Sequence, residues 1–117
     1  MTIGEMSRIL DLEDLTPELA SGDEAVLTGG YVSDLLSDVL AHAPRGGLLV
    51  TVQVHMNVVA VAVHAGLAAV VFVSGRRPQG VVIERARMER VRLFASHETG
   101  FDLVGRLYER GVRGHHE

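Results

Sequence analysis

Four short polar stretches carry the side chains that could bind a ligand or take part in chemistry. They are Thr-Gly-Gly at 28–30, His-Met-Asn at 55–57, Ser-Gly-Arg-Arg at 74–77 and Ser-His-Glu-Thr at 96–99. A histidine exchanges protons near neutral pH, and an arginine can hold a phosphate or carboxylate through two hydrogen bonds. Turns before helices leave backbone N–H groups that attract anions. Together the stretches raise the hypothesis of an anion site, although ordinary turns and helix caps would explain each one singly.

The candidate ligand-binding residues are Thr28, Gly29, Gly30, His55, Asn57, Ser74, Gly75, Arg76, His97 and Thr99. Each of them has a structural alternative. The glycine pair could simply turn the backbone, because no GxGxxG or GxxxxGK phosphate motif occurs. Asn57 could be a helix cap, His55 a hydrogen-bonded turn residue and Arg76 part of a solvated loop.

No catalytic set can be assembled from the sequence. No serine lies in a GxSxG elbow, so an enzyme would have to rely on His55 or His97 with a nearby carboxylate, Asp34 or Glu98. A metal shared by the two histidines lacks HxH or HExxH spacing. We expect no metal, no cofactor and no enzymatic activity, and a small enzyme is the least favoured hypothesis. His64 lies in an apolar run and is expected in the core or at an interface.

The composition narrows the class of protein. The chain has 117 residues, 47% of them hydrophobic, and a net charge of −4, which favours one globular domain and argues against non-specific nucleic-acid binding. It has no cysteine, and all 11 basic residues are arginine, which excludes thiol chemistry, a lysine Schiff base and a P-loop lysine. No apolar run reaches the ~18 residues of a membrane helix, and no signal peptide is recognisable, so we expect a cytoplasmic protein with no membrane partner.

Apolar periodicity predicts alternating strands and helices. A capping box at Thr2 and Glu5 opens a first helix, and residues 11–24 are expected to connect it onward, with a short extended piece near Leu15. The expected caps of later helices are Ser33, Asn57 and Thr99. The expected strands are residues 25–28, 48–54, 68–73 and 91–95, and the expected later helices are 33–43, 58–65, 79–90 and 99–110.

Residues 48–64 could instead be one strand, but that strand would have about three times the usual length. Asn57 and Gly66 suit the two ends of a helix, so we predict a strand, a turn at 55–56 and a deeply packed helix that is apolar all round.

The spacing of residues also predicts two further faces. A solvent-facing basic stripe is expected at Arg85, Arg87, Arg90 and Arg92, and a buried face of the last helix at Phe101, Val104, Leu107 and Tyr108.

The alternation of strands and helices predicts an α/β fold, a three-layer α/β/α sandwich with a mostly parallel sheet of four to five strands. Ligands of open parallel sheets bind beyond the carboxyl ends of the strands. The four polar stretches are each expected at such an end.

The run from TGGYVSDLLSDV at 28–39 through VFVSGRRP at 71–78 to LFASHETGFDLVGRLYERGV at 93–112 resembles the DRTGG domain in its small stand-alone version. The resemblance is strongest over 25–112, within one domain spanning 1–117 whose residues 113–117 are expected to form a frayed tail. Related domains accompany some phosphotransacetylases, CBS-containing pyrophosphatases and HPr kinases as regulatory, dimer-forming modules. The namesake Asp-Arg falls at Val54-His55 here, and the later Thr-Gly-Gly at Val73-Ser74-Gly75, so a ligand that needs the Asp-Arg pair is not expected.

The resemblance implies a non-catalytic regulatory or ligand-sensing module. We expect a homodimer that binds a nucleotide or other phosphorylated metabolite and acts on a partner, such as an ATPase-like or redox-enzyme subunit. The alternative is a protein-interaction or dimerisation subunit without a ligand, whose interface would include the small apolar residues 58–65.

Overall fold

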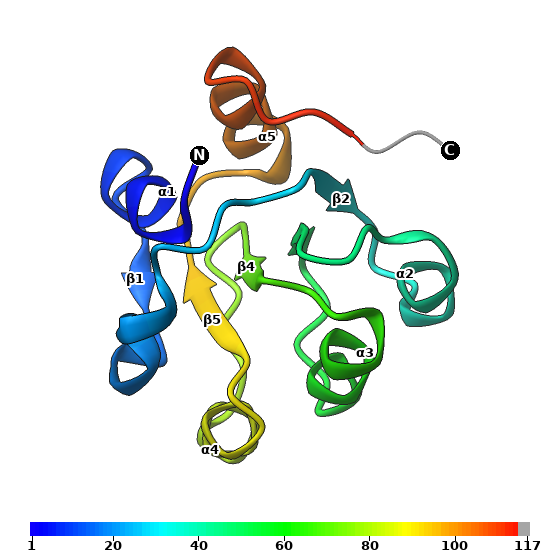
Figure 1. The fold of residues 1–117 in the computed structure, drawn as a ribbon. Coiled ribbons are helices and arrows are strands. Elements are labelled where there is room, and N and C mark those ends of the chain that lie inside the picture. Colours follow the sequence, from blue (N-terminus) through cyan, green and yellow to red (C-terminus); the bar gives the residue numbers. More distant parts are fainter. Residues whose placement is uncertain (115–117) are drawn as a thin grey trace.

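The computed structural model describes residues 1–114. After an N-terminal helix, four strands alternate with four helices, as the periodicity predicts, and a fifth strand and a 3-10 helix lie in the N-terminal connection (Figure 1). The elements are α1 (Ile3–Ile9), β1 (Glu13–Asp14), η1 (Pro17–Gly22), β2 (Gly30–Val32), α2 (Leu36–His42), β3 (Leu48–Thr51), α3 (Asn57–Ala65), β4 (Ala69–Phe72), α4 (Gly80–Met88), β5 (Arg92–Ala95) and α5 (Gly100–Glu109).

The sheet has the strand order β1-β5-β4-β3-β2. Its last four strands are parallel, and β1 pairs with β5 in the antiparallel direction. Strands β3, β4 and β5 are buried on both faces, as strands of a covered parallel sheet must be. The predicted fold class is therefore confirmed. None of the helices within residues 1–114 is long and apolar enough to cross a bilayer.

Two helical layers cover the sheet (Figure 1). Val39, Val59 and Ala86, from α2, α3 and α4, share one core cluster with Leu49 and Val70. A second cluster joins α1 and α5 to the side chains on the opposite face of the same strands, among them Met6, Leu103, Leu48, Val50 and Val71. Successive residues of a strand point to opposite faces, so both clusters are built from the same short apolar runs.

Residues 25–28 do not form the predicted strand. Val26 is 64% exposed and makes only an isolated bridge to Thr2. The strand of the sheet is β2, which begins at Gly30, beyond the end of the predicted segment. As an edge strand with one half-buried side chain, Tyr31, β2 needs no apolar run. The apolar composition that singled out 25–28 reflects packing of Leu27 beneath α1.

Two of the three predicted helix caps are wrong. Ser33 lies in a turn, where its hydroxyl accepts the N–H of Leu35 at 3.2 Å, and α2 begins only at Leu36. Asn57 is the first residue of α3 and follows the cap residue Met56. Thr99 does cap α5, because its hydroxyl accepts the N–H of Asp102 at 3.2 Å. The predicted capping box of α1 and the left-handed Gly66 after α3 are also confirmed.

Three predicted burial patterns are corrected. Helix α3 is buried on one side only, and Ala60, Val63 and His64 are exposed, so His64 is not a core residue. On α5, Leu107 is buried as predicted, but Phe101 is 90% and Tyr108 58% exposed, and the buried face includes Leu103 in their place. Apolar residues occur on both the buried and the exposed side of α5, so the spacing alone does not identify the buried side.

The C-terminal segment is ordered further than expected. The N–H of Gly30 donates to the carbonyl of Arg113 at 2.9 Å, and Gly114 bridges to Gly30. The guanidinium of Arg113 also lies 3.7 Å from the centre of the Tyr108 ring. The predicted frayed tail is therefore wrong for residues 113–114, and residues 115–117 lie outside the described part of the chain.

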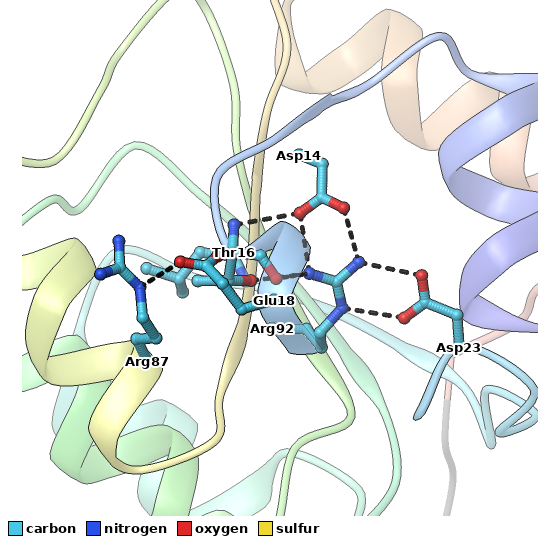
Figure 2. Close-up of polar contacts among 7 residues, drawn as sticks. Asp14, Thr16, Glu18, Asp23, Arg87 and Arg92 are labelled. Atoms are coloured by element: carbon cyan, nitrogen blue, oxygen red, sulfur yellow. Dashed lines mark hydrogen bonds and ion pairs between the residues drawn. The ribbon is translucent and has the colours of Figure 1, made fainter. Parts of the chain in front are cut away.

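Arg92 is not part of a solvent-facing stripe. It is 4% exposed, and its guanidinium lies between Asp14 and Asp23, as Figure 2 shows. Burial opposes its charge, but hydrogen bonds and charges from the two carboxylates outweigh this effect and raise the pKa of Arg92. An arginine within a buried strand has to find such partners, and here they come from the connection of residues 11–24.

Candidate functional site

A small cavity opens at the carboxyl edge of the sheet, where the connections of two neighbouring strands part. After β4 the chain turns to α4 on one face, and after β5 it turns to α5 on the other. Such divergence leaves a crevice in open α/β sheets. We call this cavity, of about 150 Å³, the carboxyl-edge crevice. It is lined by Asp11, Glu13, Gly75, Arg77, Ala95, Ser96 and His97.

Backbone hydrogen bonds fix the two loops that form the crevice. The N–H of Ser74 donates to the carbonyl of Glu98 at 2.7 Å, and that of Gly75 donates to the carbonyl of Ser96 at 3.0 Å. Ser74 and Gly75 have φ values of 60° and 71°, a left-handed conformation that favours glycine. A Cβ on Gly75 would lie 3.6 Å from Nδ1 of His97, so backbone conformation, more than space, requires glycine here.

Charges of both signs surround the crevice. Arg77 forms an ion pair with Glu13, which joins the loop after β4 to the start of β1. Arg106 pairs with Glu98 at 2.8 Å on the α5 side. The neighbouring Arg76 is exposed and makes no ion pair with any residue of 1–114. Among the described residues, this edge thus offers the unpaired guanidinium of Arg76, the paired guanidinium groups of Arg77 and Arg106, and the imidazole of His97.

The first predicted stretch lies at the opposite edge of the sheet. Gly30 pairs in register with Leu48, the first residue of β3, so residues 28–30 lead into the parallel strands and do not follow them. The hydroxyl of Thr28 donates to the carbonyl of Arg45 at 2.6 Å, and Gly29 is buried. The expectation that these residues share an edge with the other three stretches is wrong. They hold the turn before β3.

The second stretch stays at the carboxyl edge but is used locally. Nδ1 of His55 accepts the N–H of Asn57 at 3.0 Å, and the N–H of His55 is bonded to the side chain of Gln53 at 3.1 Å. His55 therefore has the hydrogen-bonded turn role that the sequence left open. Asn57 lines a different cavity, described below.

The remaining predicted ligand-binding residues lie in the two loops that form the crevice or next to them. Gly75 and His97 line the crevice, Ser74 and Arg76 flank Gly75 in its loop, and Thr99 caps α5. Asp11 and Glu13 belong to the crevice but were missed, because the antiparallel pairing of β1 with β5 brings them there from the other end of the chain. No local sequence signal identifies that pairing.

Asp34 is a further polar residue that the structure places at the carboxyl edge. It follows β2, and its carboxylate accepts the hydroxyl of Thr51 and the N–H of Val52, both at 2.9 Å. It thereby ties the loop after β2 to the end of β3. Within residues 1–114, no group of three or more histidine and acidic side chains is arranged to hold a metal ion.

A second, larger cavity lies between α3 and α4, which we call the α3–α4 cleft. It has a volume of about 550 Å³. Its lining residues are Met56, Asn57, Val59, Ala60, Val63, His64, Val81, Glu84, Arg85, Met88 and Glu89. The cleft is open along two helices and shares no lining residue with the crevice.

Comparison with protein-family models and with curated proteins finds no match. Among solved structures, the chain is similar to the CBS and DRTGG domains of the regulatory region of Clostridium perfringens pyrophosphatase, determined in complex with the activator diadenosine tetraphosphate. The TM-score is 0.73 at 10% sequence identity, over 89% of this chain and 44% of that one. At this identity the likeness concerns the fold, and the chain therefore has the fold of a part of an enzyme's regulatory region.

Proposed function

We propose that this chain is a non-catalytic regulatory module that senses a nucleotide or other phosphorylated metabolite and acts on a partner protein. The observation that carries the proposal is the carboxyl-edge crevice, at the place where open α/β sheets bind their ligands. The similar regulatory region was solved with a nucleotide activator. The DRTGG resemblance of residues 25–112 points to the same class of protein.

The crevice fits one phosphate group better than a whole nucleotide. Its volume of about 150 Å³ is well below that of an ordinary small-molecule pocket, roughly 300–1,000 Å³. A phosphate there would meet His97 and the guanidinium of Arg77, with Arg76 at the rim. The remainder of a nucleotide would lie over the exposed loop 74–77.

Ligand binding would compete with an existing ion pair. Arg77 is held by Glu13, and a phosphate offers Arg77 a stronger, two-point partner. A ligand that draws Arg77 away removes one contact between the β4 loop and β1. Because β1 has only two residues, loss of this contact would loosen the loop at the start of β1, while Arg92 continues to hold Asp14 and Asp23. Ligand binding would in this way change the surface near β1, to which a partner protein could bind.

The test is a thermal-melt panel with ATP, GTP, diadenosine tetraphosphate, acetyl phosphate and inorganic phosphate. A ligand at about 100 times its dissociation constant stabilises the folded state by about 2.7 kcal/mol, which is several degrees for a chain of this size. Arg76→Ala and His97→Gln should each reduce the shift. Arg110→Ala, another exposed arginine outside the crevice, is the matched control. A flat panel on folded protein would refute the ligand-sensing proposal.

A protein-interaction subunit without a ligand is the second candidate. It is favoured by the exposed apolar side chains of the α3–α4 cleft, among them Val63, Val81 and Met88. A flat ligand panel together with a stable protein complex would support it. A small enzyme using His55 or His97 has no comparable support, because His55 lines neither cavity and already caps a turn.

A further inference from the structure

The outer surface of α4 leaves large apolar side chains in solvent. Val81 is 59% exposed and Met88 is 68% exposed, and both line the α3–α4 cleft. Val63 and Ala60 of α3 form the opposite wall and are also exposed. Large apolar side chains that are exposed along one cleft mark a candidate interaction surface.

The residues along this surface have a self-complementary order. Val81, Glu84, Arg85 and Met88 are spaced i, i+3, i+4 and i+7, which places them on one side of α4. The order is apolar, negative, positive, apolar. Reversing the direction of the helix about the point midway between Glu84 and Arg85 exchanges the two charges and the two apolar residues.

An antiparallel second copy of α4 therefore matches the first. Val81 would face the second copy's Met88, and Glu84 would face the second copy's Arg85. A two-fold axis makes each of these contacts twice, as an isologous interface requires. Antiparallel packing also sets the two helix dipoles in opposite directions.

We propose that a second copy of this chain covers the α3–α4 cleft, with the two α4 helices antiparallel about a two-fold axis between Glu84 and Arg85. The small and medium side chains Ala60 and Val63 allow α3 of each copy to pack beside the partner's α4. The other charged groups facing this surface are Glu89 and His64. Glu89 lies 3.6 Å from Arg85, and Arg87 pairs with Glu84 at 2.7 Å, in exposed intrahelical contacts that leave both residues accessible to a partner.

Sedimentation velocity of the full chain over about 1–100 µM tests the assembly directly. The expected result is a dimer whose dissociation is promoted by Met88→Glu. Phe101→Glu is the matched control, because Phe101 is even more exposed than Met88 but lies on α5, on the other helical layer. Circular dichroism and melting of each variant establish that it is folded.

Charge reversal tests the register. Glu84→Arg or Arg85→Glu alone puts like charges across the axis and should raise the dimer dissociation constant at least tenfold. The double variant restores opposite charges and should recover most of the loss, an effect that altered helix stability would not produce.

Cross-linking gives a second readout, because the chain has no cysteine of its own. Glu84→Cys lies next to the proposed axis and should form a disulfide-linked dimer under mild oxidation, whereas Phe101→Cys should not. A wild-type chain that stays monomeric throughout the concentration range would overturn the proposal. So would a dimer that is insensitive to Met88→Glu, or one that Phe101→Glu disrupts. These outcomes do not depend on ligand binding at the crevice.

Discussion

Arg92 and Asp23 form a two-point ion pair although 69 positions separate them, with Nε and Nη2 of the arginine donating to the two carboxylate oxygens at 2.8 and 2.9 Å. The same guanidinium bonds Asp14 through Nη1 and Nη2, at 2.7 and 2.8 Å. Nη1 also reaches the hydroxyl of Thr16 at 2.7 Å. One side chain of β5 thus holds both ends of the connection that contains β1 and η1 (Figure 2).

Replacing this arginine should be severely destabilising. Arg92→Met keeps much of the packing volume but leaves two partly buried carboxylates without their partner, so we expect a loss of about 3–5 kcal/mol in the free energy of unfolding. Asp23→Asn should cost less, because Asp14 still compensates the charge of Arg92. Urea denaturation measures both values. Equal losses for the two variants would contradict the central role of Arg92.

The pair of Tyr31 and Asp38 should make stability depend on pH at both extremes. The Tyr31 hydroxyl donates to Asp38 at 2.8 Å, and this hydrogen bond, followed by one from Ser33, lowers the pKa of Asp38 below its ordinary 3.8. The same bond to Asp38, with burial and the charge of Asp38, raises the pKa of Tyr31 above 10.0.

The direction in which each group changes the stability with pH follows from the linkage between proton binding and folding. The lowered pKa of Asp38 contributes stability that is present above about pH 4 and is lost as the pH falls through its folded pKa. The raised pKa of Tyr31 contributes stability that is present below about pH 10 and is lost as the pH rises through its folded pKa. The difference in melting temperature between wild type and Tyr31→Phe should therefore be constant near neutrality and shrink at both ends. A difference that grows with acid would refute the assignment.

Two glycine substitutions should have opposite effects. A Cβ on Gly47 would lie 2.8 Å from the carbonyl oxygen of Pro44 and 3.2 Å from that of Gly29, both backbone atoms. Gly47→Ala should therefore destabilise by about 1–3 kcal/mol. Gly105 is an exposed position within α5 with open space around it, so Gly105→Ala should stabilise by about 0.5–1 kcal/mol. Melting curves of the two single variants compare them directly.

The competition proposed for the crevice predicts a gain of affinity by mutation. Glu13→Gln removes the charge that holds Arg77 and should tighten binding of whichever compound of the panel shifts the melting temperature, by about tenfold or less. Arg77→Ala should weaken the same binding. Isothermal titration calorimetry measures both constants, and Glu18→Gln, an acidic residue that pairs with Arg87 outside the crevice, is the control. Weaker binding by Glu13→Gln would argue against displacement as the mechanism.

The sequence by itself determined the elements whose signals are local. Buried strands at 48–51, 69–72 and 92–95 follow from apolar runs too short for helices, and the ends of helices at Thr2, Gly66 and Thr99 follow from backbone groups that need a cap or a left-handed residue. The alternation of these elements was enough to predict the parallel sheet with helices on both faces, because short crossovers of one hand leave few other arrangements.

Only the tertiary structure decided which groups meet across long separations. Arg92 reads as one more surface arginine until β1 and η1 bring Asp14 and Asp23 to it. Residues 28–30 read as the end of a strand until the register of Gly30 with Leu48 places them at its start. Asp11 and Glu13 enter the crevice through an antiparallel pairing of two residues. Such pairings depend on the packing free energy of the whole chain, which a short window of neighbouring residues does not determine.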